Sequence, residues 1–175
     1  MAVTIVVEDG TIVADANSYI SVADARAYAE QRGVTLPVSD DEVGAMIINS
    51  TDYIESFECK FAGERVSTEQ ELSWPRADAY LCGSDTPFPS DQIPKDLKKA
   101  QCASVIALSQ GLVLMPNITA QDYVTEETVG PITTKYANPI QTGIETKFTG
   151  IESLLERLYP DCGCNGGLAI RTVRV

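Results

Sequence analysis

The residue types that most often carry out chemistry are sparse in this 175-residue chain. Histidine is absent, which removes the commonest general base, the commonest metal ligand and the usual pH switch near neutrality. Two thiols lie close together in Cys162-Gly163-Cys164. Two sulfurs without a histidine make a poor zinc site, so we favour a flexible turn with two free thiols over a metal or redox site.

Grouped carboxylates, which could serve as general acid and base, occur at Asp40-Asp41-Glu42 and at Glu126-Glu127. The first group lies where a helix is expected to begin, and the second lies on an expected hairpin. Capping and solvated charge explain both. Neither group converges with a nucleophile or a metal-ligand set. We therefore expect no enzymatic activity, no cofactor and no bound metal.

The single tryptophan lies in Gln70-Glu71-Leu72-Ser73-Trp74-Pro75-Arg76, shortly after Phe61-Ala62-Gly63-Glu64-Arg65. Pro75 has a fixed φ and disfavours helix at the residue before it, so the indole and the guanidinium extend from a stiff backbone. We favour the interpretation that Trp74 anchors the core beneath an irregular loop, with Arg76 stacked on it or paired with a carboxylate. The alternative is an exposed Trp74 and Arg76 that anchor a partner.

Bulk properties are those of one globular domain, residues 1–175, with 44% hydrophobic residues and a net charge of -12. The acidic balance disfavours wrapping of nucleic acid, although solubility alone would also explain it. Cys59, Cys82 and Cys102 lack the spacing of a disulfide framework, which favours a reduced, cytosolic chain. The N-terminus has no secretory pattern and no apolar run approaches the length of a membrane span, so we expect no membrane association.

Four segments have helical signatures, which predict a mainly α fold with minor β structure, built as a small four-helix bundle. The first begins at the cap Ser21 and ends at Gly33, and the second runs from Ser39 or Asp40 to Phe57. The third begins with Pro94 in its first turn and ends at Gly111. Its second half is apolar on nearly every side, so we expect it to be the central helix. A capping box of Thr149 and Glu152 begins the fourth, and Pro160 stops it.

Extended segments flank these helices. Residues 1–20 are expected to form an N-terminal strand or arm, and residues 121–137 to form a hairpin or a pair of arms that turns at Gly130-Pro131. The C-terminal arm, residues 161–175, follows a glycine-rich turn with the strand-like stretch 168–175. That stretch could pair with the sheet edge of a neighbour or with residues 3–7 of its own chain.

The order of these features resembles a family of tailed-bacteriophage proteins. The matching stretches are Val7-Glu8-Asp9-Gly10, Asp15-Ala16-Asn17-Ser18-Tyr19, Ala23-Asp24, Ala45 to Tyr53, Gly63-x-Arg65, Gln70-x-Leu72-x-Trp74-Pro75-Arg76, Ile93-Pro94, Ala100-Gln101-Cys102 and Val129-Gly130-Pro131 up to Tyr136. The chain is similar over nearly its full length to head-tail adaptor (head-completion) proteins, often labelled DnaT-like single-stranded-DNA-binding proteins. The segment ending in Trp74-Pro75-Arg76 is the most specific part.

The resemblance implies a structural role in the virion, after assembly in the cytoplasm of the host bacterium. Such adaptors form a ring, twelve copies in the family, beneath the portal protein. The ring extends the DNA channel and docks the next connector or tail protein. Double-stranded DNA passes through without specific binding, and acidic side chains along the wall would repel its backbone.

Two sets of residues follow from these considerations. The first set, in the two β-prone arms, is expected to contact neighbouring subunits or the portal: Val124, Glu126, Val129, Ile132, Tyr136, Ile170, Arg171, Val173, Arg174 and Val175. The second set is expected mainly to pack the loop between the second and third helices: Phe61, Arg65, Gln70, Leu72, Trp74, Pro75 and Arg76.

A different class of function stays open, that of a replication accessory protein that binds single-stranded DNA. Such proteins use a basic groove with interleaved aromatic side chains. In this chain the basic residues Lys95, Lys98 and Lys99 form only a short cluster at a helix start, beside Asp91 and Asp96. The adaptor is therefore the function that the sequence favours.

Overall fold

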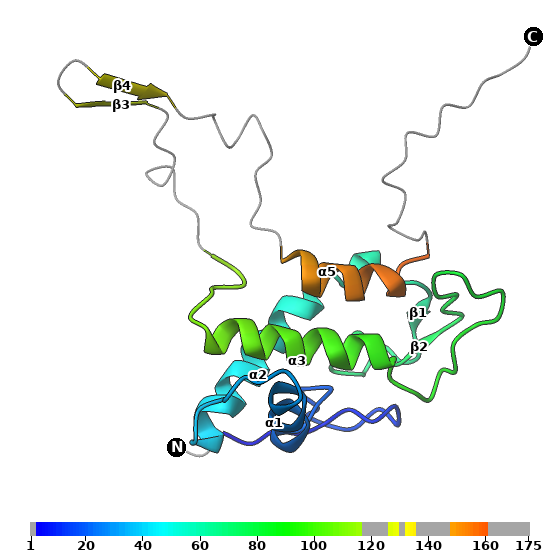
Figure 1. Ribbon diagram of the computed structural model, residues 1–175. Helices are drawn as coiled ribbons and strands as arrows, with labels where there is room; N and C mark the ends of the chain where they lie inside the picture. The colour runs from blue at the N-terminus through cyan, green and yellow to red at the C-terminus, as the bar shows by residue number, and fades with distance from the viewer. Residues whose placement is uncertain (1–2, 117–125, 130–131, 136–147, 161–175) are drawn as a thin grey trace, which may run out of the picture.

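The computed structural model describes residues 3–116, 126–129, 132–135 and 148–160 (Figure 1). Within them, four α-helices form the body: α1 (Val22–Glu30), α2 (Asp40–Glu55), α3 (Lys95–Ser109) and α5 (Thr149–Leu155). Two 3-10 turns, η1 (Glu58–Lys60) and η3 (Glu156–Leu158), lie after α2 and α5. The predicted mainly α fold with minor β structure is confirmed.

Helix starts follow the capping signals, with two shifts of one residue. Ser21 and Asp24 form the predicted capping box of α1, and Ser39 caps α2. Pro94 lies at the N-cap of α3, just before the helix. The predicted capping box of Thr149 is wrong, because Thr149 is already helical and the cap falls on Phe148. The Glu152 carboxylate accepts a hydrogen bond from the Phe148 N–H at 3.1 Å.

Helix α3 is the central helix, as predicted. It contacts α1, α2 and α5, and Figure 1 shows it running between α1 and α5. Its buried side chains point to more than one side of the helix: Leu97, Ala100, Gln101, Cys102, Ser104, Val105 and Ala107. Because these residues meet three other helices, α3 carries much of the apolar burial that stabilises the fold.

The core divides into two clusters that meet around α3. One lies between α2, α3, α5 and the loop before α3, and its largest fully buried side chains include Tyr19, Trp74 and Leu155. The other lies between α1, α2 and α3 and includes Ile20 and Ile47. Full burial of one such aliphatic side chain contributes about 1.5–3 kcal/mol.

Two small antiparallel sheets complete the described structure. Strand β3 (Glu126–Val129) pairs with β4 (Ile132–Lys135), with Val129 opposite Ile132. The predicted hairpin is therefore confirmed, with residues 130–131 between its strands. Strand β1 (Glu64–Arg65) pairs with β2 (Arg76–Ala77), which the sequence did not predict. Strands of two residues are too short to show a period of alternation.

The N-terminal segment is extended and forms no regular strand in residues 3–20. The chain folds back on itself, so that Val7 and Ser18 form a single parallel bridge. The Glu8 N–H donates to Ser18 O at 2.8 Å, and the Asn17 N–H donates to Val6 O at 2.9 Å. Of the two alternatives for this segment, the extended arm holds and the strand is wrong. The predicted C-terminal strand, 168–175, lies outside the described residues.

Candidate functional site

Trp74 lies at the centre of the candidate site and is fully buried. Its ring meets Phe61 and Phe88 edge-on, with centroids 6.1 Å and 6.0 Å away. Such arrangements add about 0.5–1.5 kcal/mol to the gain from burial. The Trp74–Pro75 peptide bond is cis. The prediction that Trp74 anchors the core is confirmed, and the alternative of an exposed partner anchor is wrong.

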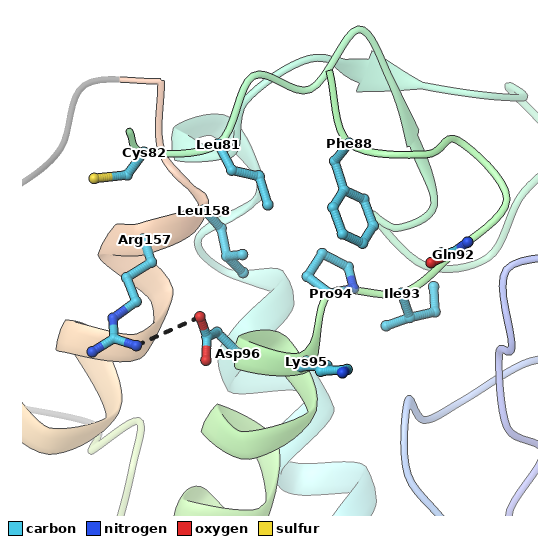
Figure 2. Close-up of a pocket in the computed structure, with 10 residues that line it drawn as sticks. All are labelled: Leu81, Cys82, Phe88, Gln92, Ile93, Pro94, Lys95, Asp96, Arg157 and Leu158. Atoms are coloured by element: carbon cyan, nitrogen blue, oxygen red, sulfur yellow. Dashed lines mark ion pairs between the residues drawn. The ribbon is translucent and has the colours of Figure 1, made fainter. Parts of the chain in front are cut away.

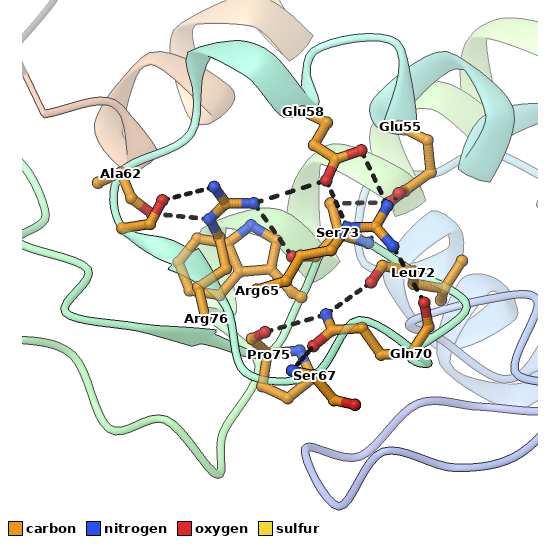
Figure 3. Close-up of polar contacts among 12 residues, drawn as sticks. Glu55, Glu58, Ala62, Arg65, Ser67, Gln70, Leu72, Ser73, Pro75 and Arg76 are labelled. Atoms are coloured by element: carbon orange, nitrogen blue, oxygen red, sulfur yellow. Dashed lines mark hydrogen bonds and ion pairs between the residues drawn. The ribbon is translucent and has the colours of Figure 1, made fainter.

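Arg76 is 7% exposed and holds the backbone of the preceding loop (Figure 3). Its guanidinium donates to Ala62 O at 2.8 Å, Gly63 O at 2.6 Å and Ser73 O at 3.3 Å. The Glu58 carboxylate lies 3.9 Å away. Burial lowers the pKa of Arg76, but a guanidinium stays protonated in proteins. A carboxylate is thus a secondary partner, and three carbonyl groups are the main ones.

Gln70 fixes the loop from the other side. Its amide nitrogen donates to Leu72 O at 2.7 Å and to Pro75 O at 3.1 Å. Its amide oxygen accepts from the Ser67 N–H at 3.0 Å. The side chain is 4% exposed, so these contacts satisfy a buried polar group. This arrangement explains structurally why a glutamine stands four residues before the tryptophan.

Arg65 links the loop to η1, the 3-10 turn that follows α2. Two of its nitrogens bond to the Glu58 carboxylate oxygens, and a third donates to Gln70 O at 3.0 Å. The hydrogen bond from Arg65 is the main cause that lowers the pKa of Glu58. Both side chains are about one third exposed, so the pair contributes modestly to stability.

Glu55, which sequence reasoning missed, ties the N-terminal arm to this loop. The Tyr19 hydroxyl donates to Glu55 Oε1 at 2.6 Å, and the Ser73 N–H donates to Glu55 Oε2 at 2.8 Å. The Trp74 N–H donates in turn to the Tyr19 hydroxyl at 3.2 Å. Burial raises the pKa of Glu55, and these hydrogen bonds oppose that shift. Partners 36 and 18 residues away give no local signal in the sequence.

Glu8 and Gln101 form two further buried polar centres. Glu8 is 1% exposed, and its carboxylate accepts from the N–H groups of Gly10, Ile12 and Val13 at 2.8–3.0 Å. Gln101 accepts from the Tyr19 N–H at 3.0 Å and donates to side chains of the N-terminal arm and of α2. Both side chains belong to the stretches that carried the family resemblance. Their contacts position backbone rather than a ligand.

The arrangement contains no assembled catalytic group among the described residues. Within these same ranges, no three or more Cys, Asp or Glu side chains are placed to hold a metal ion. Asp40, Asp41 and Glu42 lie in the first turn of α2, where acidic residues favour the helix. Glu126 and Glu127 lie in β3. None of the helices in the described part of the chain combines the length and apolarity needed to cross a bilayer.

The cysteines differ from one another. Cys59 is exposed, and Cys102 is buried in the helical core. Burial raises the pKa of the Cys102 thiol to about 12. Cys82 is disulfide-bonded, so the expectation of a reduced residue at this position is wrong. Spacing along the chain could not indicate this bond, because a disulfide depends on distance in the fold. Cys162 and Cys164 lie outside the described residues.

The predicted interface residues are described in part. Glu126 lies opposite Lys135, and Val129 lies opposite Ile132, across the β3–β4 hairpin. The remaining members of that set lie outside the described residues: Val124, Tyr136, Ile170, Arg171, Val173, Arg174 and Val175. The packing residues are Phe61, Arg65, Gln70, Leu72, Trp74, Pro75 and Arg76, and the structure brings all of them together in one loop.

A mainly α protein built around a buried polar loop is the class that the fold and the site define. Over residues 3–175 the chain matches the family described as "Putative DnaT-like ssDNA binding protein", and it belongs to that family. No protein of curated function and no solved structure matches it.

Proposed function

We propose that this protein is a head-tail adaptor of a tailed bacteriophage, a structural subunit that forms a ring beneath the portal. The observation that carries the proposal is the use of the Gln70–Arg76 segment. Its Trp74, Gln70 and Arg76 side chains are buried and bonded within the chain. The segment most specific to the family resemblance thus stabilises the fold of the subunit, and in this proposal other parts of the chain contact the partners.

The β-prone segments are the contact elements in this proposal. Among the described residues, the β3–β4 sheet has two strands, so each of its outer edges would offer backbone groups to another chain. The segment 168–175 combines β-branched residues with two arginines. Both segments would link a subunit to its neighbours, to the portal or to the next tail protein.

The charge suits a wall along which DNA must slide. The chain carries 25 acidic and 13 basic residues. Among the described basic side chains, Arg26, Arg65, Lys99 and Arg157 are in ion pairs with the chain's own carboxylates. An excess of acidic over basic residues repels the phosphate backbone, which would keep DNA from adhering during packaging and ejection.

Replacement of residues 168–175 by a Gly/Ser stretch of equal length tests the docking role. We expect the purified variant to remain folded, because the described core clusters contain no residue of this segment. In infected cells, filled heads and free tails should accumulate unjoined. A variant phage that assembles with normal yield would overturn the assignment of this segment.

The second candidate, binding of single-stranded DNA, is favoured by the description of the family. Its chemical basis would be Lys95, Lys98 and Lys99 at the start of α3. Lys99 is paired with Asp96 at 3.1 Å, and Lys98 lowers the pKa of Asp9 and Asp24 as a minor cause. Salt-sensitive binding of a labelled oligonucleotide at micromolar protein would support this candidate over the adaptor.

A further inference from the structure

An open pocket lies at the start of α3, between η3 and the loop that precedes the helix (Figure 2). Its volume is about 540 Å³, within the range of roughly 300–1,000 Å³ typical of ligand sites. The apolar lining is formed by Leu81, Phe88, Ile93, Pro94 and Leu158. Charged groups border it, with Arg157 3.6 Å from Asp96. An apolar interior with a charged border suits a short peptide that carries both kinds of side chain.

The chain itself places such a peptide nearby. Leu158, which lines the pocket, is two residues from Pro160, where the described structure ends. Residues 161–167 then precede the segment 168–175. Seven residues span at most roughly 23–25 Å when extended, at 3.3–3.6 Å each. A linker of this length can return the segment to the pocket, and a short tether raises the effective concentration of the segment there.

The segment 168–175 is complementary to the pocket and its surroundings. In an extended chain, Leu168 and Ile170 project from the same face, so both could enter one apolar cavity. The segment has two arginines, Arg171 and Arg174, and no acidic side chain. The loop before α3, residues 78–93, has no Lys or Arg and carries three exposed carboxylates: Asp78, Asp85 and Asp91. The apolar side chains therefore match the pocket, whereas the arginines match the acidic loop beside it, because the pocket's own charged lining is Lys95, Asp96 and Arg157.

We propose that this pocket is the seat of the chain's own C-terminal segment, residues 168–175. Leu168 and Ile170 fill the apolar part, and Arg171 and Arg174 face the acidic loop. The consequence for assembly, namely that a docking segment is stored on its own subunit, rests on the proposed function. The binding itself does not, and it is measured without any portal protein.

The experiment uses the full-length chain and a fluorescent peptide of residues 168–175. In the double variant Leu168→Asp/Ile170→Asp, here called the emptied variant, the C-terminal segment should leave the pocket, because a carboxylate is disfavoured in an apolar environment. We expect the peptide to bind this variant at least about tenfold more tightly than the unaltered chain, in which the tethered segment competes. A peptide carrying Ile170→Asp should bind neither protein.

Matched substitutions locate the binding site. Leu81→Arg in the Leu168/Ile170 variant should weaken peptide binding at least about tenfold, because it places bulk and positive charge at the pocket. Leu112→Arg is the control, since Leu112 is half-exposed beyond the other end of α3. It should leave binding unchanged. Thermal melting of each variant checks that the fold persists.

Several outcomes would overturn the proposal. The first is that the peptide binds the unaltered chain and the emptied variant equally tightly. The second is that it does not bind the emptied variant. The third is that Leu112→Arg, and not Leu81→Arg, weakens peptide binding. Self-association of the unaltered chain that the emptied variant loses would assign the seat to the segment of a second copy. Any of these results leaves head-tail joining to be judged by its own assay.

Discussion

Replacement of Arg76 by alanine should destabilise the protein strongly, because this side chain holds three carbonyl groups beneath the Trp74 loop. The guanidinium donates to Ala62 O, Gly63 O and Ser73 O. Alanine offers no donor. The loop would have to open to water or keep buried acceptors unpaired.

The size of the loss follows from these contacts. Ala62 and Ser73 are both buried, and a buried acceptor without a partner costs about 1–3 kcal/mol. Partial relaxation of the loop reduces the sum, so we expect the free energy of unfolding to fall by about 3 kcal/mol. For a domain of 175 residues, this corresponds to a fall in melting temperature of about 6–12 °C.

Urea unfolding and thermal melting measure this loss, with two matched variants. Arg76→Lys keeps the charge but loses the forked guanidinium that reaches several carbonyl groups at once. Its stability should therefore lie between that of the unaltered protein and that of Arg76→Ala. Arg32→Ala is the control for removal of a surface arginine. Arg32 is exposed, 3.3 Å from the centroid of the Tyr28 ring, and its loss should cost at most about 1 kcal/mol.

A stability of Arg76→Ala within about 0.5 kcal/mol of the unaltered protein would refute this reasoning. Failure of head-tail joining without any such loss would indicate that Arg76 contacts a partner directly. The melting curve must therefore be measured before any assembly defect is interpreted.

Three other predictions follow from single residues. Gly63→Ala should lower the free energy of unfolding by about 2–4 kcal/mol, because φ is 73° and the new Cβ would lie 2.2 Å from Ala77 O. The control Gly33→Ala has a similar φ of 68° but open space around the new Cβ, so it should cost only about 1 kcal/mol. Equal losses of stability in urea unfolding would contradict this prediction. The pKa of Glu58 is lowered in the folded state, so its contribution is present above the unfolded value near 4.5 and is lost as pH falls through the folded pKa. Glu58→Gln should thus be less stable by under about 1 kcal/mol at pH 7, with a difference that closes below pH 4.5; a constant difference across pH would argue against the Arg65 pair as its cause. In native protein, a thiol reagent should label Cys59 quickly and Cys102 only on unfolding, whereas Cys82 should require reduction first; rapid labelling of Cys82 would contradict its disulfide.

Local signals predicted the helices well. Ser21 with Asp24, and Ser39, act within a few residues, and the apolar stripes have a period that survives in the fold. The predicted end of the fourth helix at Pro160 is wrong, because α5 ends at Leu155 and the 3-10 turn η3 follows it to Leu158. The shift of the α5 cap from Thr149 to Phe148 shows the limit of this reading. Phe148 and Thr149 both precede Glu152 at about the distance of a capping box, and the backbone geometry decides which of them is the N-cap.

The candidate site was predicted only in outline. Burial of Trp74 follows from its size and apolar character, but the three carbonyl partners of Arg76 are backbone groups, which every residue has. Tyr19, Glu55 and Ser73 meet from three distant parts of the chain. Such networks depend on tertiary structure, so no spacing in the sequence could indicate them.

Electron microscopy of the purified protein, alone and mixed with the portal protein of the same phage, tests the proposed adaptor role most directly. We expect closed rings of this protein on the narrow end of the portal, coaxial with its channel. Portal particles that gain no density at saturating protein, while the same preparation shifts a single-stranded oligonucleotide, would contradict the adaptor and favour the DNA-binding alternative.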